Sequence, residues 1–220
     1  MGARAGVRST QKTDSESIQR RSSHFRWFWD YAGGMMTDWG VHLLDIVQMA
    51  FDETMPTAVT ALGDKFWLTD NRDTPDTLAV TYQYPGFIAT YENRNANDES
   101  MFDKRYGILF HGTKGTLFVD RSLYRFVPQR GSEFSEREVK SSNNANMAHW
   151  ANFLECIKTR QKPISDIEVC QRSTTTCLLG NVALRSKLRV DFDSKKWTAA
   201  QAEARKLFSR EERKPWKLVV

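Results

Sequence analysis

Alternating hydrophobic and polar positions dominate the middle of the chain, between stretches with helical spacing. From residue 35 to residue 51, apolar side chains recur every three or four positions, which predicts a helix with Thr37 or Asp38 at its N-cap. Alternation then runs from residue 57 to about residue 139, in segments rich in Val, Thr, Tyr and Phe, as strands are. Helical spacing returns in three later segments, at residues 146–159, 167–187 and 199–208.

Short connections between the predicted strands indicate that sequence neighbours run antiparallel. Pro85-Gly86 separates one pair and residues 112–115 (GTKG) separate another, so each pair can form a hairpin. The predicted strands are residues 58–68, 77–84, 87–93, 106–111, 116–121 and 124–128. A block of strands with helices before and after it predicts an α+β fold, in which helices pack on one face of a large, mostly antiparallel sheet.

The first 23 residues differ from the rest of the chain. They are polar and basic and have almost no large apolar side chains, which predicts a disordered tail (residues 1–23) before one domain at residues 24–220. Arg20-Arg21 is not followed by the apolar segment of an export signal, so we expect no targeting signal and a cytoplasmic location by default. No run approaches the ~18 apolar residues of a membrane helix, so no membrane span is expected.

The distribution of charge and of potential metal ligands argues against two classes of function, nucleic-acid binding and metal binding. The chain has 32 Lys and Arg against 27 Asp and Glu, a net charge of +5 that is spread out rather than gathered with aromatics on one element. We therefore expect no nucleic-acid binding. The three cysteines form no C-x-x-C pair and the four histidines lack the spacing of paired ligands, so no metal site is predicted.

Three polar side chains share one face of the first predicted helix. At about 100° per residue, Asp38, His42 and Asp45 project together from a helix that is apolar almost all round. An imidazole beside carboxylates suits acid–base chemistry, because histidine titrates near neutral pH. The spacing also fits a simpler interpretation, in which the helix dipole favours Asp38 and Asp45 is merely solvated.

An ordered series of motifs resembles one enzyme family. Residues 33–45 (GGMMTDWGVHLLD) resemble the G-G-x-x-x-D-x-G-x-H-x-x-D signature of the glucose–fructose oxidoreductase, inositol dehydrogenase and MocA (Gfo/Idh/MocA) family, and residues 25–31 (FRWFWDY) resemble the aromatic segment of a bacterial subgroup. Further similar runs are residues 74–77, 91–94, 112–117, 149–156, 163–166 and 180–185. The resemblance spans residues 24–219 and points to the C-terminal domain of such an enzyme.

The resemblance implies roles for residues of the first helix. In that family the matching histidine transfers a proton at the sugar hydroxyl being oxidised, which implies that His42 is the acid/base and Asp38 its partner. Asp45 matches the signature too, as a substrate contact or a structural residue. The cofactor implied is NAD or NADP, whose nicotinamide accepts the hydride.

Other residues are candidates for a sugar or polyol pocket. Arg26, Trp27 and Tyr31 lie near the helix entrance, where aromatic faces and an arginine fork suit a polyol, although packing explains them equally well. Tyr91 and Asn93 end a predicted strand beside a polar loop, and such loops often carry binding residues.

The 220 residues contain neither the G-x-G-x-x-G turn of a Rossmann domain nor the Glu-Lys-Pro motif of the family. We therefore expect no cofactor binding and no activity from this chain alone. The first hypothesis is the substrate domain of an NAD(P)-dependent sugar or polyol oxidoreductase. The alternatives are a non-catalytic scaffold for oligomerisation or carbohydrate binding, and part of a nicotinamide-dependent glycoside-cleaving enzyme. A sheet face left uncovered by helices implies a homo-oligomer.

Overall fold

The computed structural model describes residues 24–52, 54–97, 99–100, 104–142, 144–212 and 214–217. These residues form two compact units. The first unit combines the chain up to residue 97 with the chain from residue 170 onward, and the second unit is residues 98–169. The tail predicted at residues 1–23 lies outside the described residues.

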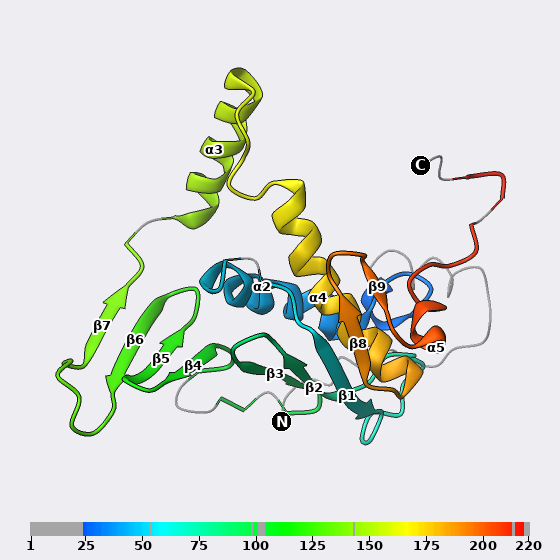
Figure 1. The fold of residues 1–220 in the computed structure, drawn as a ribbon, viewed down its shortest axis with the longest axis horizontal. Coiled ribbons are helices and arrows are strands. Elements are labelled where there is room, and N and C mark those ends of the chain that lie inside the picture. The colour runs from blue at the N-terminus through cyan, green and yellow to red at the C-terminus, as the bar shows by residue number, and fades with distance from the viewer. Residues whose placement is uncertain are drawn as a thin grey trace. The chain divides into compact units, whose positions relative to one another are not determined.

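The first unit contains a five-stranded antiparallel sheet with strand order β3-β2-β1-β8-β9 (Figure 1). Its strands are β1 (Ala58–Asp64), β2 (Thr77–Gln83), β3 (Ile88–Arg94), β8 (Val190–Asp193) and β9 (Thr198–Ala199). Its helices are the 3-10 helix η1 (Phe25–Trp27), α2 (Gly34–Ala50), α4 (Ile167–Ser186), whose first turn precedes the unit boundary, and α5 (Ala202–Arg205).

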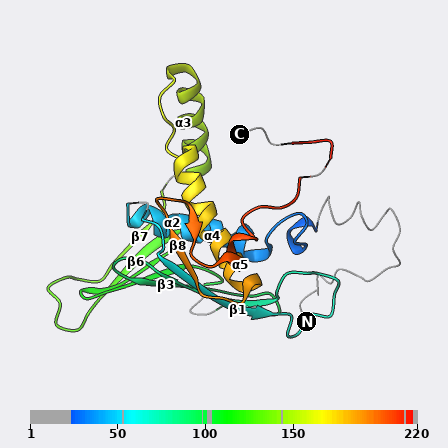
Figure 2. The ribbon, with the colours of Figure 1, turned by 45° about the vertical axis from the view of Figure 1, so that its right-hand side comes forward.

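The hydrophobic core lies between this sheet and the helices α2 and α4, which cover the same face of it (Figure 2). Alternation along β2 buries Leu78, Val80 and Tyr82, because successive side chains of a strand point to opposite faces. Leu44 of α2 and Cys177 of α4 pack against them. The other face of the sheet is exposed and carries Thr60, Leu62, Ala79, Thr81, Ile88 and Thr90. Helices on one face of an antiparallel sheet confirm the predicted α+β class.

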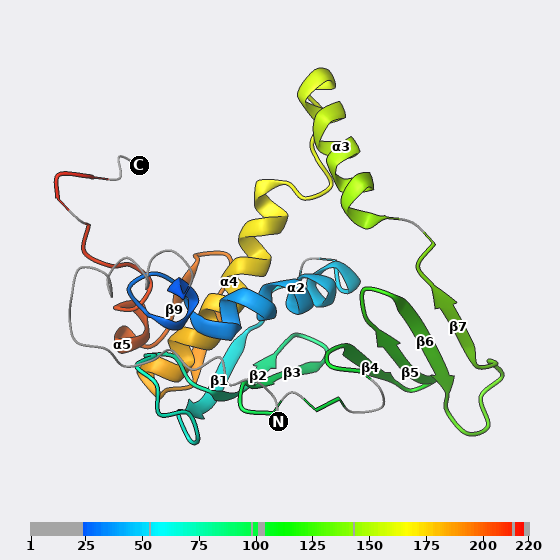
Figure 3. The same cartoon turned by 180° about the vertical axis from the view of Figure 1, so that it is seen from behind.

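The second unit contains a four-stranded antiparallel sheet with strand order β4-β5-β6-β7 (Figure 3). Its elements are β4 (Ile108–Gly112), β5 (Gly115–Val119), β6 (Leu123–Pro128), β7 (Arg137–Lys140) and the helix α3 (Ala145–Thr159). Asn144 caps α3, since its side-chain oxygen accepts from two backbone N–H groups of the first turn. Among the described residues of this unit, no hydrophobic side chain is buried. No helix in the described ranges is long and apolar enough to cross a membrane.

Two details differ from the sequence predictions. The strands divide between two sheets rather than forming one, because alternation reveals which face a residue occupies but not which strand is its partner. The N-cap of α2 is Gly33 rather than Thr37 or Asp38, both of which lie inside the helix. The Thr37 hydroxyl still serves the helix start, because it accepts a hydrogen bond from the Gly33 N–H at 3.0 Å.

Candidate functional site

The start of α2 contacts two other segments, the loop residue Thr74 and Asn181 of α4. Gly34 adopts a φ of 65°, a left-handed conformation that favours glycine, and a Cβ there would lie 2.9 Å from the Cβ of Thr74. The Gly33 carbonyl accepts a hydrogen bond from Asn181 Nδ2 of α4 at 2.9 Å. Both glycines of the signature therefore lie in close contact with another segment, Gly33 with Asn181 and Gly34 with Thr74. These two contacts hold the first turn of α2 in place.

Arg26 and Asp38 come together at this helix start. Arg26 Nε lies 2.8 Å from Asp38 Oδ2, and the two side chains are 37% and 33% exposed. The Arg26 guanidinium also lies 5.8 Å from the Phe25 ring centre and 5.9 Å from that of Trp27. The pair is partly shielded by aromatic rings and still open to solvent, so a ligand can reach it.

His42 lies one helical turn after Asp38 and is exposed. Its imidazole meets the Trp39 ring edge-on, with ring centres 6.3 Å apart and an angle of 75° between the planes. Within the described part of the chain, the imidazole makes no hydrogen bond or ion pair. Its ring nitrogens are therefore available to an incoming hydroxyl group.

Asp45, the third polar residue of the predicted face, contacts α4. Its Oδ1 accepts a hydrogen bond of 2.5 Å from the Ser173 hydroxyl, and its side chain is half-buried. A hydrogen bond to a carboxylate is stronger than one between neutral groups, so this contact helps to hold α2 against α4. The structure thus gives Asp38 and Asp45 different partners, Arg26 for the first and Ser173 for the second.

Tyr91 and Asn93 on β3 are placed differently from the exposed residues of α2. Tyr91 is buried, and its hydroxyl donates to the Met35 carbonyl at 3.1 Å. Burial raises the pKa of Tyr91, and the negative charge of Asp38 adds to the effect. Asn93 donates from Nδ2 to Asn95 Oδ1 at 2.8 Å. Tyr91 therefore holds the first turn of α2 from the side of the sheet, whereas Asn93 bonds only to a residue two positions along the chain.

Trp27 and Tyr31 flank η1 in different ways. The Trp27 carbonyl accepts from the backbone N–H groups of Asp73 and Thr74, at 2.9 and 3.2 Å. Tyr31 is 42% exposed, and its own backbone N–H bonds to Phe28. Of the predicted site residues, the structure therefore brings Arg26, Trp27 and Asp38 together at the start of α2, with His42 one helical turn further along.

Sequence reasoning missed Ser173 and Asn181, which hold α2 from α4. Both side chains are buried on a helix whose other buried positions are mostly small or apolar. A serine and an asparagine eight residues apart on such a face are the signal that would have identified them, because buried polar groups require partners.

The described residues offer little to a metal ion or a dinucleotide. No group of three or more His, Cys, Asp and Glu is arranged to hold a metal within these ranges. At the glycine pair, the Gly33 N–H already bonds to Thr37 and the backbone of Gly34 lies against Thr74, so neither group is open as a phosphate cradle.

A family model described as an oxidoreductase family, C-terminal alpha/beta domain (GFO_IDH_MocA_C2), matches residues 10–218. No curated protein matches the chain in sequence.

Several solved structures share the fold. The aldose–aldose oxidoreductase from Caulobacter crescentus, complexed with glycerol, is 20% identical with a TM-score of 0.62, and the match covers 77% of this chain and 51% of that one. The WlbA dehydrogenase from Bordetella pertussis, in complex with NADH and UDP-GlcNAcA, is 13% identical with a TM-score of 0.53, covering 78% and 49%. An oxidoreductase from Agrobacterium radiobacter, in complex with NAD+, L-tartaric acid and magnesium, is 11% identical with a TM-score of 0.57, covering 78% and 52%. The chain spans about half the length of these proteins.

Proposed function

The chain belongs to the Gfo/Idh/MocA oxidoreductase family, as the C-terminal alpha/beta domain of that family, and from this premise we propose that it binds the substrate of an NAD(P)-dependent oxidoreductase acting on a sugar or polyol hydroxyl. The observation that carries the proposal is the Arg26–Asp38 ion pair one helical turn from an accessible His42. A hydrogen-bond acceptor and a donor can recognise a hydroxyl group, and a nearby imidazole can take its proton when the hydroxyl is oxidised.

Each side chain has a distinct task in this proposal. Asp38 accepts a hydrogen bond from a substrate hydroxyl, and Arg26 holds the carboxylate in place while its remaining N–H groups donate to a neighbouring oxygen. His42 takes the proton of the hydroxyl that is oxidised. Nicotinamide supplies hydride acceptance in this family, and the described residues add binding, orientation and proton transfer.

Two solved relatives support the class of substrate. The aldose–aldose oxidoreductase was crystallised with glycerol, a polyol, and the WlbA dehydrogenase with a nucleotide sugar. At 20% and 13% identity these relatives share the fold with this chain. The sugar or polyol class for this chain therefore remains our proposal.

The exposed face of the five-stranded sheet favours a second role, the assembly of copies of this chain. Leu62 on this face is 82% exposed and Ile88 is 69% exposed, while Phe66 and Trp67 follow β1 at 73% and 70%. On this face Leu62 and Ile88 lie at opposite ends of the paired strands, with Thr60, Thr81 and Thr90 between them. Exposed apolar side chains on a sheet face that no helix covers favour an interface. Oligomerisation is compatible with substrate binding, because α2 lies on the opposite face of the sheet.

The binding proposal is tested by titrating the chain with glycerol, myo-inositol and glucose, using isothermal titration calorimetry and saturation-transfer NMR. Asp38→Asn should weaken binding about tenfold, since it removes a charged acceptor. His111→Ala, an exposed histidine of the second unit, is the matched control and should bind as the wild type does. Absence of saturable binding for every sugar and polyol would contradict the proposal.

His42 is tested separately, in an enzyme that joins this chain to a nucleotide-binding domain. His42→Ala should reduce turnover by about 10²–10⁴-fold, the usual contribution of general acid–base catalysis, with little loss of cofactor affinity. The rate of NAD(P)H formation and the cofactor Kd measure the two effects. Unchanged turnover would remove His42 from the mechanism.

A further inference from the structure

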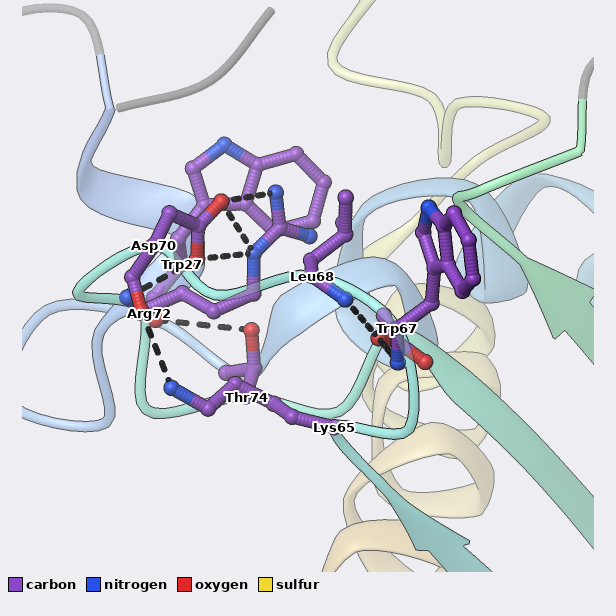
Figure 4. Close-up of polar contacts among 8 residues, drawn as sticks. Trp27, Lys65, Trp67, Leu68, Asp70, Arg72 and Thr74 are labelled. Atoms are coloured by element: carbon purple, nitrogen blue, oxygen red, sulfur yellow. Dashed lines mark hydrogen bonds and ion pairs between the residues drawn. The ribbon is translucent and has the colours of Figure 1, made fainter. Parts of the chain in front are cut away.

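A buried ion pair lies in the loop that joins β1 to β2. Arg72 donates from Nε to both carboxylate oxygens of Asp70, at 2.9 and 3.0 Å, and from Nη2 at 2.8 Å. The two side chains are only 3% and 6% exposed. The Arg72 guanidinium lies over the indole of Trp27, 4.3 Å from the ring centre (Figure 4).

The same loop also forms hydrogen bonds with the backbone of Trp27. The Trp27 carbonyl accepts from the N–H of Asp73, from the N–H of Thr74 and, at 3.4 Å, from the Thr74 hydroxyl. The element that contains Trp27, η1, is only three residues long and therefore cannot hold its own geometry. Contacts with the loop at ring and carbonyl fix both ends of this residue. Arg26, which pairs with Asp38, is its immediate neighbour.

Stability alone does not explain this arrangement. Removing two charges from water is costly, and a well-packed pair of apolar side chains commonly stabilises a protein as much as a buried ion pair. Arg72 Nη1 is moreover buried without a hydrogen-bond partner, which adds to the cost. What a planar guanidinium provides beyond an apolar group is a single orientation, because it combines a bidentate fork with a flat face for stacking.

We propose that Arg72 and Asp70 are positioning residues for the polyol site. They lock the Trp27 ring, and the locked backbone of η1 places the Arg26 guanidinium against Asp38. This inference rests on the proposed function insofar as the Arg26–Asp38 pair binds the polyol. It adds two residues that touch no substrate and act through Trp27.

The test uses the 220-residue chain and two measurements. In the wild type, the Arg26 Nε–H group should exchange slowly with solvent and give a protected NMR signal, because Nε is buried beside the Asp38 carboxylate. Arg26→Lys identifies that signal by its loss. Arg72→Met should accelerate exchange of this proton with solvent and weaken glycerol or myo-inositol binding roughly fivefold, in the range expected of coupled residues. Arg72→Lys retains the charge but not the fork or flat face, and should give an intermediate result.

Arg189→Met is the matched control, because it breaks another arginine–aspartate pair of the first unit, at 2.8 Å between Arg189 Nε and Asp191 Oδ1. It should leave both measurements unchanged. Circular dichroism establishes that each variant is folded at the working temperature, and Asp70→Asn replaces Arg72→Met if the latter does not fold.

An Arg26 signal that is unchanged in the folded variants would overturn the positioning role. A changed signal in a chain whose wild type binds no polyol would instead sustain the positioning role and count against the proposed function. The two proposals therefore fail in distinguishable ways.

Discussion

At the residue scale, Asp76 shows how a single carboxylate organises a loop. It is fully buried, and its Oδ2 accepts from the backbone N–H groups of Trp67 and Leu68 at 2.9 and 2.8 Å. Oδ1 accepts from the Thr77 hydroxyl at 2.8 Å. Burial by itself would raise the pKa of Asp76, but these hydrogen bonds to the charged form outweigh it and hold the pKa below its ordinary value.

The lowered pKa of Asp76 predicts a pH dependence of stability. The unfolded chain takes up this proton at a higher pH than the folded chain, so the contribution of Asp76 is complete above about pH 5 and is lost as the pH falls through and below about 4. Asp76→Asn should lower the free energy of unfolding at pH 7 and flatten its decline toward pH 3. Urea unfolding at pH 7, 5 and 3 measures this effect.

Asp73→Asn provides the comparison for Asp76, since Asp73 lies in the same loop with an exposed side chain. It should follow the wild-type pH profile. An Asp76→Asn profile as steep as that of the wild type would show that other carboxylates control the acid transition.

At the scale of one element, α2 shows what the sequence can and cannot predict. The 100° period places Asp38, His42 and Asp45 on one face without any tertiary information. The true start of the helix depends on Gly34, whose positive φ matches the close approach of Thr74, forty residues away in the chain. In the sequence around residue 34, only the glycines themselves indicate that another segment packs closely here.

Turn residues correctly predicted the hairpins β2–β3 and β4–β5, whereas pairing between strands that are distant in the sequence could not be predicted. Alternation located β1, β2 and β3, but β8 joins β1 through only two residue pairs, Ala58 with Asp191 and Val59 with Val190. Such a short strand carries too little alternation to be recognised in isolation. Ser173 was not predicted as a partner of Asp45, because the sequence of α4 does not show which helix packs against it.

The approach of Gly34 to Thr74 predicts a cost for any side chain at that position. Gly34→Ala should reduce the free energy of unfolding by about 1–3 kcal/mol, because alanine disfavours a left-handed φ and its Cβ would meet the Thr74 side chain. Urea denaturation measures the change.

Gly86→Ala is the control for this substitution, since a Cβ at Gly86 would meet no atom within 4 Å. It should change stability by no more than about 0.5 kcal/mol. Equal effects at the two glycines would contradict the packing explanation.

At the scale of the whole molecule, the exposed face of the five-stranded sheet predicts self-association. Leu62 lies on this face near the end of β1, opposite Ala79 of β2. Leu62→Glu should shift the chain toward monomer, because a second copy would have to bury the new charge. Light scattering coupled to size-exclusion chromatography, at about 50 µM protein, measures the mass.

Leu109→Glu serves as the control, since Leu109 is 56% exposed and belongs to the second unit rather than to the five-stranded sheet. Its mass should equal that of the wild type. A wild-type chain that is already monomeric at this concentration would contradict association through the sheet.

The burial of Cys177 makes the reaction rate of its thiol a measure of local opening in the core. Burial raises the pKa of this thiol to about 12, with a further contribution from Asp45, so at neutral pH it is both protonated and shielded. Cys156 and Cys170 are more accessible, and they should react first with a thiol reagent. The slow reaction of Cys177 then measures how often α4 separates from the sheet that it covers, which would also break the Asp45–Ser173 hydrogen bond between α4 and α2.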